Sequence, residues 1–147
     1  MLGVSLEQIF NSLNVIKYIS KFRNFLYLWN ILPVRQKYFT TKFCKEVQDF
    51  LRTIEPKAAE KIAWNIDLAE HTNDPRLFKK LTDEVWEFRT KYRNLQYRLL
   101  AFWDKTQDHE TLVFATHGII KKSDKMPTKE IEKTKEIRKQ YFKQIKK

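Results

Sequence analysis

The chain has 147 residues, which is the size of one domain, and its 42% hydrophobic residues are enough to form a core. Two glycines, four prolines and the single Cys44 exclude collagen-like and low-complexity sequence, an internal disulfide framework, and any paired-cysteine metal or redox motif. Every run of about 18 residues contains a charge, so we expect no integral membrane association.

The net charge of +11 is concentrated near the C-terminus. Residues 117–147 contain eleven Lys or Arg residues and four acidic ones, so this segment carries +7 of the excess. Such a charge favours a polyanionic partner, namely nucleic acid, the ribosome or an acidic protein. A solvated basic helix is the alternative.

Residues 1–33 read as a separate segment. Apolar residues follow helical spacing from Leu6 onwards, and Pro33 ends the pattern. The segment is an extra helix packed on the domain, a membrane-surface helix, or sequence upstream of the true start codon. We expect it to have no catalytic function and place the functional domain at residues 34–147.

The next segments predict two helices after a short edge strand at Lys37–Thr41. Apolar residues from Phe43 to Ile54 form one helical stripe, beside which Cys44 is expected to pack inertly. A second helix begins at Pro56 and ends near His71. Because the connection is so short, the two helices should form an antiparallel hairpin.

The hydrophobic period then changes to two, which predicts strands at Val85–Lys91, Gln96–Trp103 and Glu110–Ile119. Short loops between them favour antiparallel pairing, and a final helix begins at Pro127. The predicted fold class is therefore α+β, with the helical hairpin and the C-terminal helix packed on a small antiparallel sheet.

Common catalytic and cofactor motifs are absent. There is no glycine-rich phosphate loop, and the three histidines share no metal-ligand spacing, so we expect neither a metal nor a cofactor. The strands instead present cations. A hairpin loop at Tyr92–Leu95 places Arg89 opposite Arg98, with Glu87 on the same face. Opposed like charges repel, which favours a bound phosphate between them, provided that the register holds.

Several segments, in order and spacing, resemble the RelE/HigB-type toxins of bacterial toxin–antitoxin systems, particularly the phage-related branch. The resemblance covers about residues 35–143, and it is carried by Lys80-Leu81, Val85–Arg89, Tyr97–Leu100, His117–Lys122, Lys125–Pro127 and Glu130–Lys133. It implies a RelE-like fold and a cytoplasmic mRNA endoribonuclease that cuts translated mRNA, in most relatives in the ribosomal A site. It also implies a cognate antitoxin protein as partner, and a reaction in which the 2′-OH attacks the adjacent phosphate.

The resemblance also implies roles for individual residues. Arg98 matches the family's catalytic arginine and would stabilise the phosphate, and Arg89 would act as a base or a charge stabiliser. Arginine is a poor base, so Glu87 or His117 would be the better proton acceptor. The remaining basic positions are the catalytic pair Lys121 and Lys122 and the RNA-binding residues Lys125, Lys129 and Lys80. Tyr141 is expected in the core, which leaves the general acid unassigned.

Two other functions are compatible with the sequence. A ParE-like protein would inhibit DNA gyrase through protein binding and would not need the catalytic cations. A catalytically inactive nucleic-acid-binding module is the second alternative, because the general acid is missing.

Overall fold

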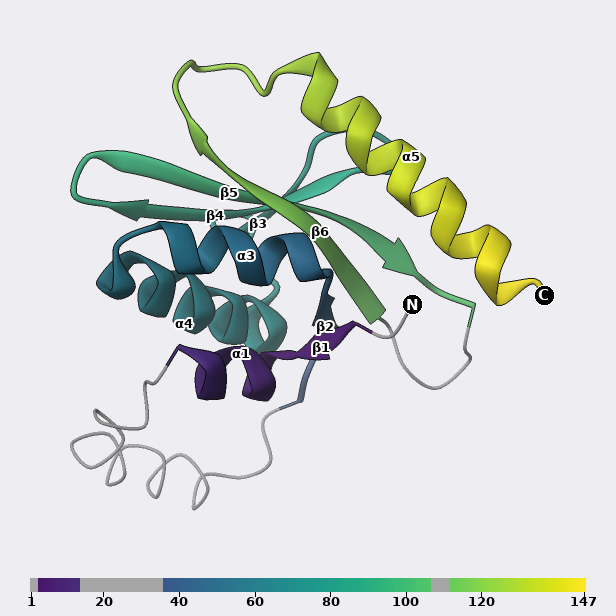
Figure 1. Ribbon diagram of the computed structural model, residues 1–147, viewed down its shortest axis with the longest axis horizontal. Helices are drawn as coiled ribbons and strands as arrows, with labels where there is room; N and C mark the ends of the chain where they lie inside the picture. Colours follow the sequence, from purple (N-terminus) through teal and green to yellow (C-terminus); the bar gives the residue numbers. More distant parts are fainter. Residues whose placement is uncertain (1–2, 14–35, 107–111) are drawn as a thin grey trace.

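The computed structural model describes residues 3–13, 36–106 and 112–147 and contains one six-stranded sheet with helices on both faces (Figure 1). The strand order is β1-β2-β6-β5-β4-β3. The strands are β1 (Val4–Ser5), β2 (Thr40–Phe43), β3 (Phe78–Lys80), β4 (Trp86–Tyr92), β5 (Leu95–Asp104) and β6 (Leu112–Lys121). The helices are α1 (Leu6–Ser12), α3 (Lys45–Thr53), α4 (Pro56–Thr72) and α5 (Thr128–Ile145).

The α+β fold class is confirmed, including the helical hairpin α3–α4 and the C-terminal helix. The helices α1, α3 and α4 lie on one side of the sheet and α5 lies on the other (Figure 1). The inner face of α4 is buried in the main core, and consists of Ala59, Ile62, Ala63, Ile66 and Ala69.

The sheet is mixed, whereas an antiparallel sheet was expected. Strand β2 pairs in parallel with β6, and β1 pairs antiparallel with β2, so β2 is an inner strand and not the predicted edge. Strand β2 ends at Phe43, and Cys44 occupies the N-cap position of α3. The apolar stripe of this helix therefore begins one turn later than the hydrophobic spacing suggests. Burial and the nearby Glu46 raise the pKa of the Cys44 thiol to about 11, which keeps it protonated and unreactive.

The N-terminal residues 3–13 form part of the same sheet and core. Ser5 caps α1 through a reciprocal pair of hydrogen bonds with Gln8, and the buried Leu6 and Ile9 join the main core. The predicted boundary at residue 33 and the predicted strand start at Glu110 lie outside the described residues. Within the part described, no helix combines the length and hydrophobicity of a membrane span.

The β4–β5 hairpin fixes the register of the candidate site. Its two-residue turn consists of Arg93 and Asn94, which have φ values of 45° and 64°, as a type I′ turn requires. The pairing places Arg89 opposite Arg98, as predicted. Glu87 lies one pleat repeat further along the same face.

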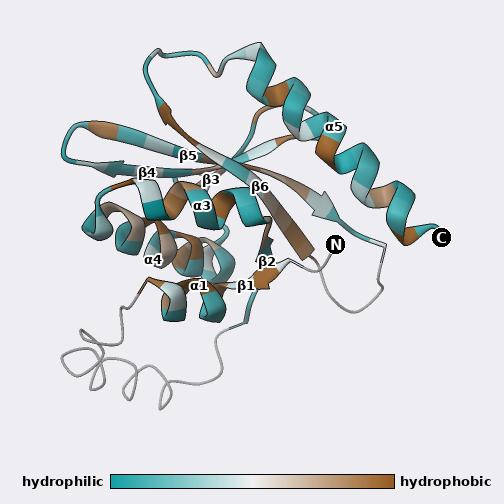
Figure 2. Cartoon of the chain, in the orientation of Figure 1, coloured by the Kyte–Doolittle hydropathy of each residue, from teal (hydrophilic) through white to brown (hydrophobic). Residues whose placement is uncertain are grey.

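Most of α5 is hydrophilic, with hydrophobic residues interspersed along it (Figure 2). Tyr141 packs against Phe102 and Phe114, and its hydroxyl donates a 2.6 Å hydrogen bond to Asp104 Oδ2. Tyr141 is therefore a core residue, as expected, and burial followed by contact with Asp104 raises the pKa of its hydroxyl. This contact anchors the C-terminal half of α5 to the end of β5.

Gly118 allows α3 to pack closely on β6. A Cβ at this position would lie 2.2 Å from Phe50 Cδ1 and 2.7 Å from Phe50 Cγ. Although alanine suits a strand better than glycine does, this clash should dominate. We expect Gly118→Ala to lower the free energy of unfolding by about 1–3 kcal/mol, measured by urea denaturation. The loss should be much smaller in a Phe50→Ala background, and equal losses in both backgrounds would contradict the clash.

Candidate functional site

Three charged side chains of β4 and β5 meet on the sheet face on which α5 lies. The Glu87 carboxylate lies between two guanidinium groups, with Oε1 3.5 Å from Arg89 Nε and Oε2 3.5 Å from Arg98 Nε. The side chains of Glu87 and Arg98 are buried, whereas Arg89 is 35% exposed. The three groups together carry a formal net charge of +1. Arg89 is the member of the cluster that is accessible to solvent.

This geometry changes the argument about the opposed arginines. The like-charge pair was expected to need a bound phosphate, but Glu87 already lies between the two cations and relieves their repulsion. A phosphate is therefore not required to explain the pairing. The residual positive charge still provides an electrostatic attraction for one.

Arg98 is held in a fixed orientation. Its Nη1 donates to the Tyr97 carbonyl oxygen at 2.9 Å and its Nη2 donates to Gln96 Oε1 at 2.7 Å. Burial lowers the pKa of Arg98, and Glu87 offsets part of that effect. Guanidinium has five N–H donors, so donors on both Nη atoms remain for a phosphate.

A shallow cleft of about 250 Å³ opens over this cluster, and it is lined by Arg76, Arg89, Thr90, Lys91, Gln96 and Arg98. The sequence reasoning missed four of these residues, namely Arg76, Thr90, Lys91 and Gln96. Lys91 and Gln96 are cross-strand partners on the arginine face, so the same alternation that selected Arg89 would have selected them. Arg76 comes from the loop before β3, where it binds Asp74, and no periodic signal could have placed it here.

The predicted lysines reach this face to different extents. Lys121 is the cross-strand partner of Gln96, and its Nζ donates to the Asp124 carbonyl oxygen. Lys122 and Lys125 are exposed in the loop after β6. Lys129 is exposed in the first turn of α5, 4.0 Å from Glu130. None of these four lysines lines the cleft, and only Lys121 is the direct strand partner of a residue that does.

His117 lies on the same sheet face but beneath α5. Its Nε2 is 2.8 Å from Glu130 Oε2, and its Nδ1 is 2.9 Å from the Thr116 hydroxyl. Burial lowers the pKa of His117, although Glu130 offsets part of the shift. Both ring nitrogens are thus engaged within the protein, so Glu87 is the better placed of the two predicted proton acceptors.

Lys80 does not join the other predicted residues. Lys80 pairs with Trp86, so strand alternation places it on the opposite face of the sheet from Glu87. Its ammonium lies 3.3 Å from Asp83. Hydrophobic periodicity alone could not show which face of the sheet Lys80 lies on, because β3 has only three residues. Lys80 instead lines a second, larger cleft.

In residues 3–13, 36–106 and 112–147, no three His, Cys, Asp or Glu side chains are placed to bind a metal ion. The cluster itself contains groups for acid–base and electrostatic chemistry, namely one carboxylate and two guanidinium groups. A carboxylate beside two guanidinium groups can accept a proton from a hydroxyl while the cations stabilise a phosphate that gains charge.

The chain matches the model of a known protein family. The family model for phage-derived Gp49-like proteins (DUF891) matches residues 49–139, which is more than half of the chain. This region runs from α3 into α5 and includes Glu87, Arg89, Arg98 and His117. No curated protein matches the chain.

Proposed function

Because the chain belongs to the Gp49-like family of phage-derived proteins, which is a RelE-like, toxin-like family, we propose that it is the toxin of a type II toxin–antitoxin pair and an mRNA endoribonuclease. The observation that carries this proposal is the cluster of Glu87, Arg89 and Arg98, whose two arginines line an open cleft. A carboxylate that can accept a proton lies 3.5 Å from each of two cations that can bind a phosphate.

The proposed reaction is transphosphorylation within the RNA strand. Glu87 accepts the proton of the 2′-OH, whose oxygen then bonds to the adjacent phosphorus. Arg98 and Arg89 stabilise the extra negative charge of the phosphorane. The bond to the 5′-oxygen breaks, this oxygen takes a proton from water, and the products are a 2′,3′-cyclic phosphate and a 5′-OH.

Basic residues beyond the cleft suit RNA in the ribosomal A site. Four lysines that lie between the end of β6 and the start of α5 would contact phosphates, and these are Lys121, Lys122, Lys125 and Lys129. The exposed basic residues of α5 would contact ribosomal RNA. Such contacts carry little sequence information and weaken with salt. A ribosomal target places the protein in the cytoplasm, and a cognate antitoxin would silence it.

A second candidate function is ParE-like inhibition of DNA gyrase, since fold alone does not determine function. It gives no role to Gln96, whose amide oxygen accepts from Arg98 in the floor of the cleft. A binding module without catalytic activity gives no role to Glu87 as a proton acceptor.

The test is inducible expression of the full chain in bacteria, beside Arg89→Ala and a control, Arg52→Ala. Arg89 is partly exposed and Arg52 is an exposed arginine of α3 that pairs with Asp49, so both variants should fold. We expect growth arrest and new 5′ ends within reading frames for wild type and Arg52→Ala, and neither for Arg89→Ala. Arrest with intact mRNA would favour gyrase or another protein target and would contradict the proposal.

A further inference from the structure

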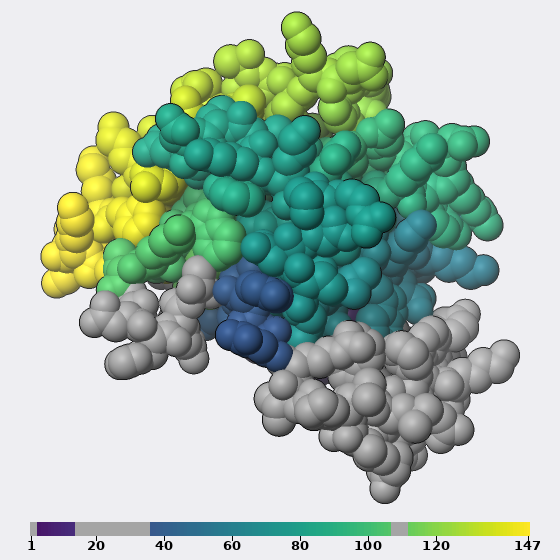
Figure 3. Space-filling view, turned by 180° about the vertical axis from the view of Figure 1, so that it is seen from behind, coloured from purple at the N-terminus to yellow at the C-terminus, as the bar shows by residue number. Residues whose placement is uncertain are grey.

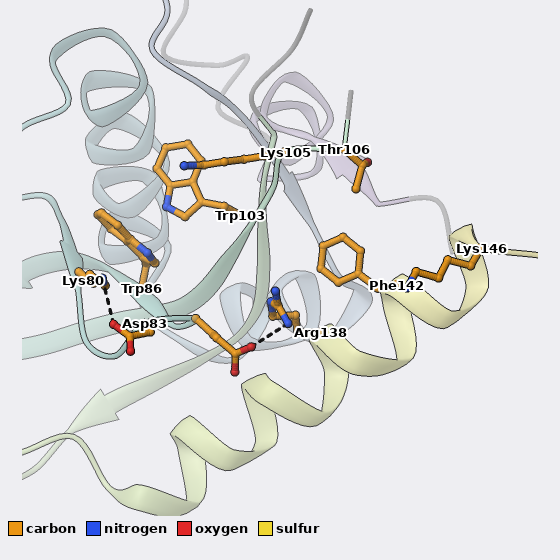
Figure 4. A pocket seen from close by; sticks show the side chains of 10 residues that line it. Lys80, Asp83, Trp86, Trp103, Lys105, Thr106, Arg138, Phe142 and Lys146 are labelled. Carbon is orange, nitrogen blue, oxygen red and sulfur yellow. Dashed lines mark ion pairs between the residues drawn. The ribbon is translucent and has the colours of Figure 1, made fainter. Parts of the chain in front are cut away.

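A second cleft, of about 670 Å³, lies at the opposite end of β5 from Arg98. It is bordered by the β3–β4 loop, the end of β5 and the C-terminal half of α5 (Figure 4). Figure 3 shows this side of the molecule, where the yellow end of α5 lies next to the green end of β5. The volume lies in the range of binding pockets for small ligands and peptide side chains.

Aromatic rings form the apolar part of this cleft. Trp86 and Trp103 meet edge to face with their centroids 5.5 Å apart, and Phe142 comes from α5. All three are only partly buried, and Figure 4 shows them around one opening. They provide a site for an apolar side chain.

Cations surround these rings. Two of them, Lys80 and Arg138, are paired with the acidic residues of the cleft: Lys80 with Asp83 at 3.3 Å, and Arg138 with Glu84 at 3.0 Å. The other two, Lys105 and Lys146, are exposed and have no acidic partner among the described residues. The cleft is therefore apolar at its centre and has a positive border.

The same contacts argue against an RNA base in the cleft. Lys105 Nζ lies 5.3 Å from the centre of the Trp103 ring, and the Arg138 guanidinium lies 4.9 Å from that of Phe142. The ring faces that bases would stack on are therefore partly covered by cations.

We propose that this cleft is a docking site for an acidic peptide segment of a partner protein, in which an apolar side chain enters between Trp86, Trp103 and Phe142. Flanking Asp or Glu residues of the peptide pair with Lys105 and Lys146. The pattern of one buried anchor and a charged border is common in peptide recognition. This proposal does not depend on RNA cleavage, since it uses no residue of the cleft that contains Arg98.

The test uses the full chain labelled with ¹⁵N and a panel of synthetic peptides of about 12 residues. Each peptide has a central Leu, Ile, Phe or Trp flanked by glutamates, and matched peptides carry glutamine flanks or a central serine. The indole N–H signals of Trp86 and Trp103 report on the cleft, and that of Trp64 on α4 is the internal reference. An oligouridylate RNA of equal length is the competing ligand.

We expect the acidic peptides with an apolar centre to shift the Trp86 and Trp103 signals and to bind about tenfold more tightly than either matched set. The double variant Lys105→Glu/Lys146→Glu should weaken this binding about tenfold. The control Lys139→Glu/Lys143→Glu makes the same charge change on exposed residues of α5 outside the cleft and should have little effect.

Three results would overturn the proposal. These are binding weaker than about 1 mM for every peptide of the panel, equal weakening by the two double variants, and tighter binding of oligouridylate than of any peptide with shifts at Trp86 and Trp103. The last result would assign the cleft to RNA. Loss of RNA cleavage activity would leave the peptide result unchanged, so the two proposals fail separately.

Discussion

Replacing Arg98 by alanine is expected to lower the rate constant of RNA cleavage about a thousandfold. The reason is that one fixed donor to a charge that develops in the transition state contributes about that much. Arg98 is oriented before substrate binds, by Tyr97 and Gln96 on one side and by Glu87 on the other. The measurement is single-turnover cleavage of an end-labelled mRNA, offered free and on programmed ribosomes.

Arg98→Lys separates charge from geometry. Lysine keeps the positive charge but has no planar fork, so it cannot contact Gln96, Glu87 and a phosphate together. We therefore expect its rate to be close to that of Arg98→Ala, while Gln96→Ala, which removes only one positioning contact, should lose much less. Full activity of Arg98→Lys would show that the arginine acts only as a point charge.

The alanine variant needs a folding control, because it leaves the buried Glu87 carboxylate with Arg89 alone. The double variant Arg98→Ala/Glu87→Gln removes both charges of the buried pair, so urea denaturation should give it a higher unfolding free energy than Arg98→Ala. It also lacks the proposed proton acceptor and therefore serves as a control of stability alone. If Arg98→Ala is unfolded at the temperature of the cleavage assay, its loss of cleavage is a folding effect.

The sequence was informative where the structure is local. The change of hydrophobic period located β4 and β5, and the short turn between them fixed the pairing of Arg89 with Arg98. Amphipathic spacing located α4 with its buried face. These features depend on residues that are close together in the sequence, so the sequence alone contains the information needed to predict them.

The remaining features depend on contacts between distant segments. The parallel pairing of β2 with β6 joins strands about 70 residues apart, and the coverage of His117 by α5 depends on the path of the chain after Lys121. The β4 alternation placed Glu87 beside Arg89, but only side-chain geometry shows that its carboxylate reaches both arginines. The position of Lys80 away from the arginine cluster could not be predicted either, because β3 has only three residues.

Glu70 is expected to make the protein less stable as the pH rises. Its side chain is 1% exposed near the end of α4. Burial raises the pKa of Glu70 from 4.5 to about 7, although the Lys37 ammonium at 3.6 Å offsets part of the shift. Between these two values the folded state binds a proton that the unfolded state has lost, so unfolding free energy falls through this range by about 3 kcal/mol.

Glu70→Gln removes this titration and keeps the shape of the side chain. Urea denaturation should therefore give similar stabilities for variant and wild type near pH 4.5, and a variant that is about 3 kcal/mol more stable at pH 8. Lys37→Ala should steepen the fall in wild type, because the carboxylate loses its only nearby cation among the described residues, and should leave the slope of Glu70→Gln unchanged. Parallel curves for wild type and Glu70→Gln from pH 5 to 8 would show that another group controls the pH dependence.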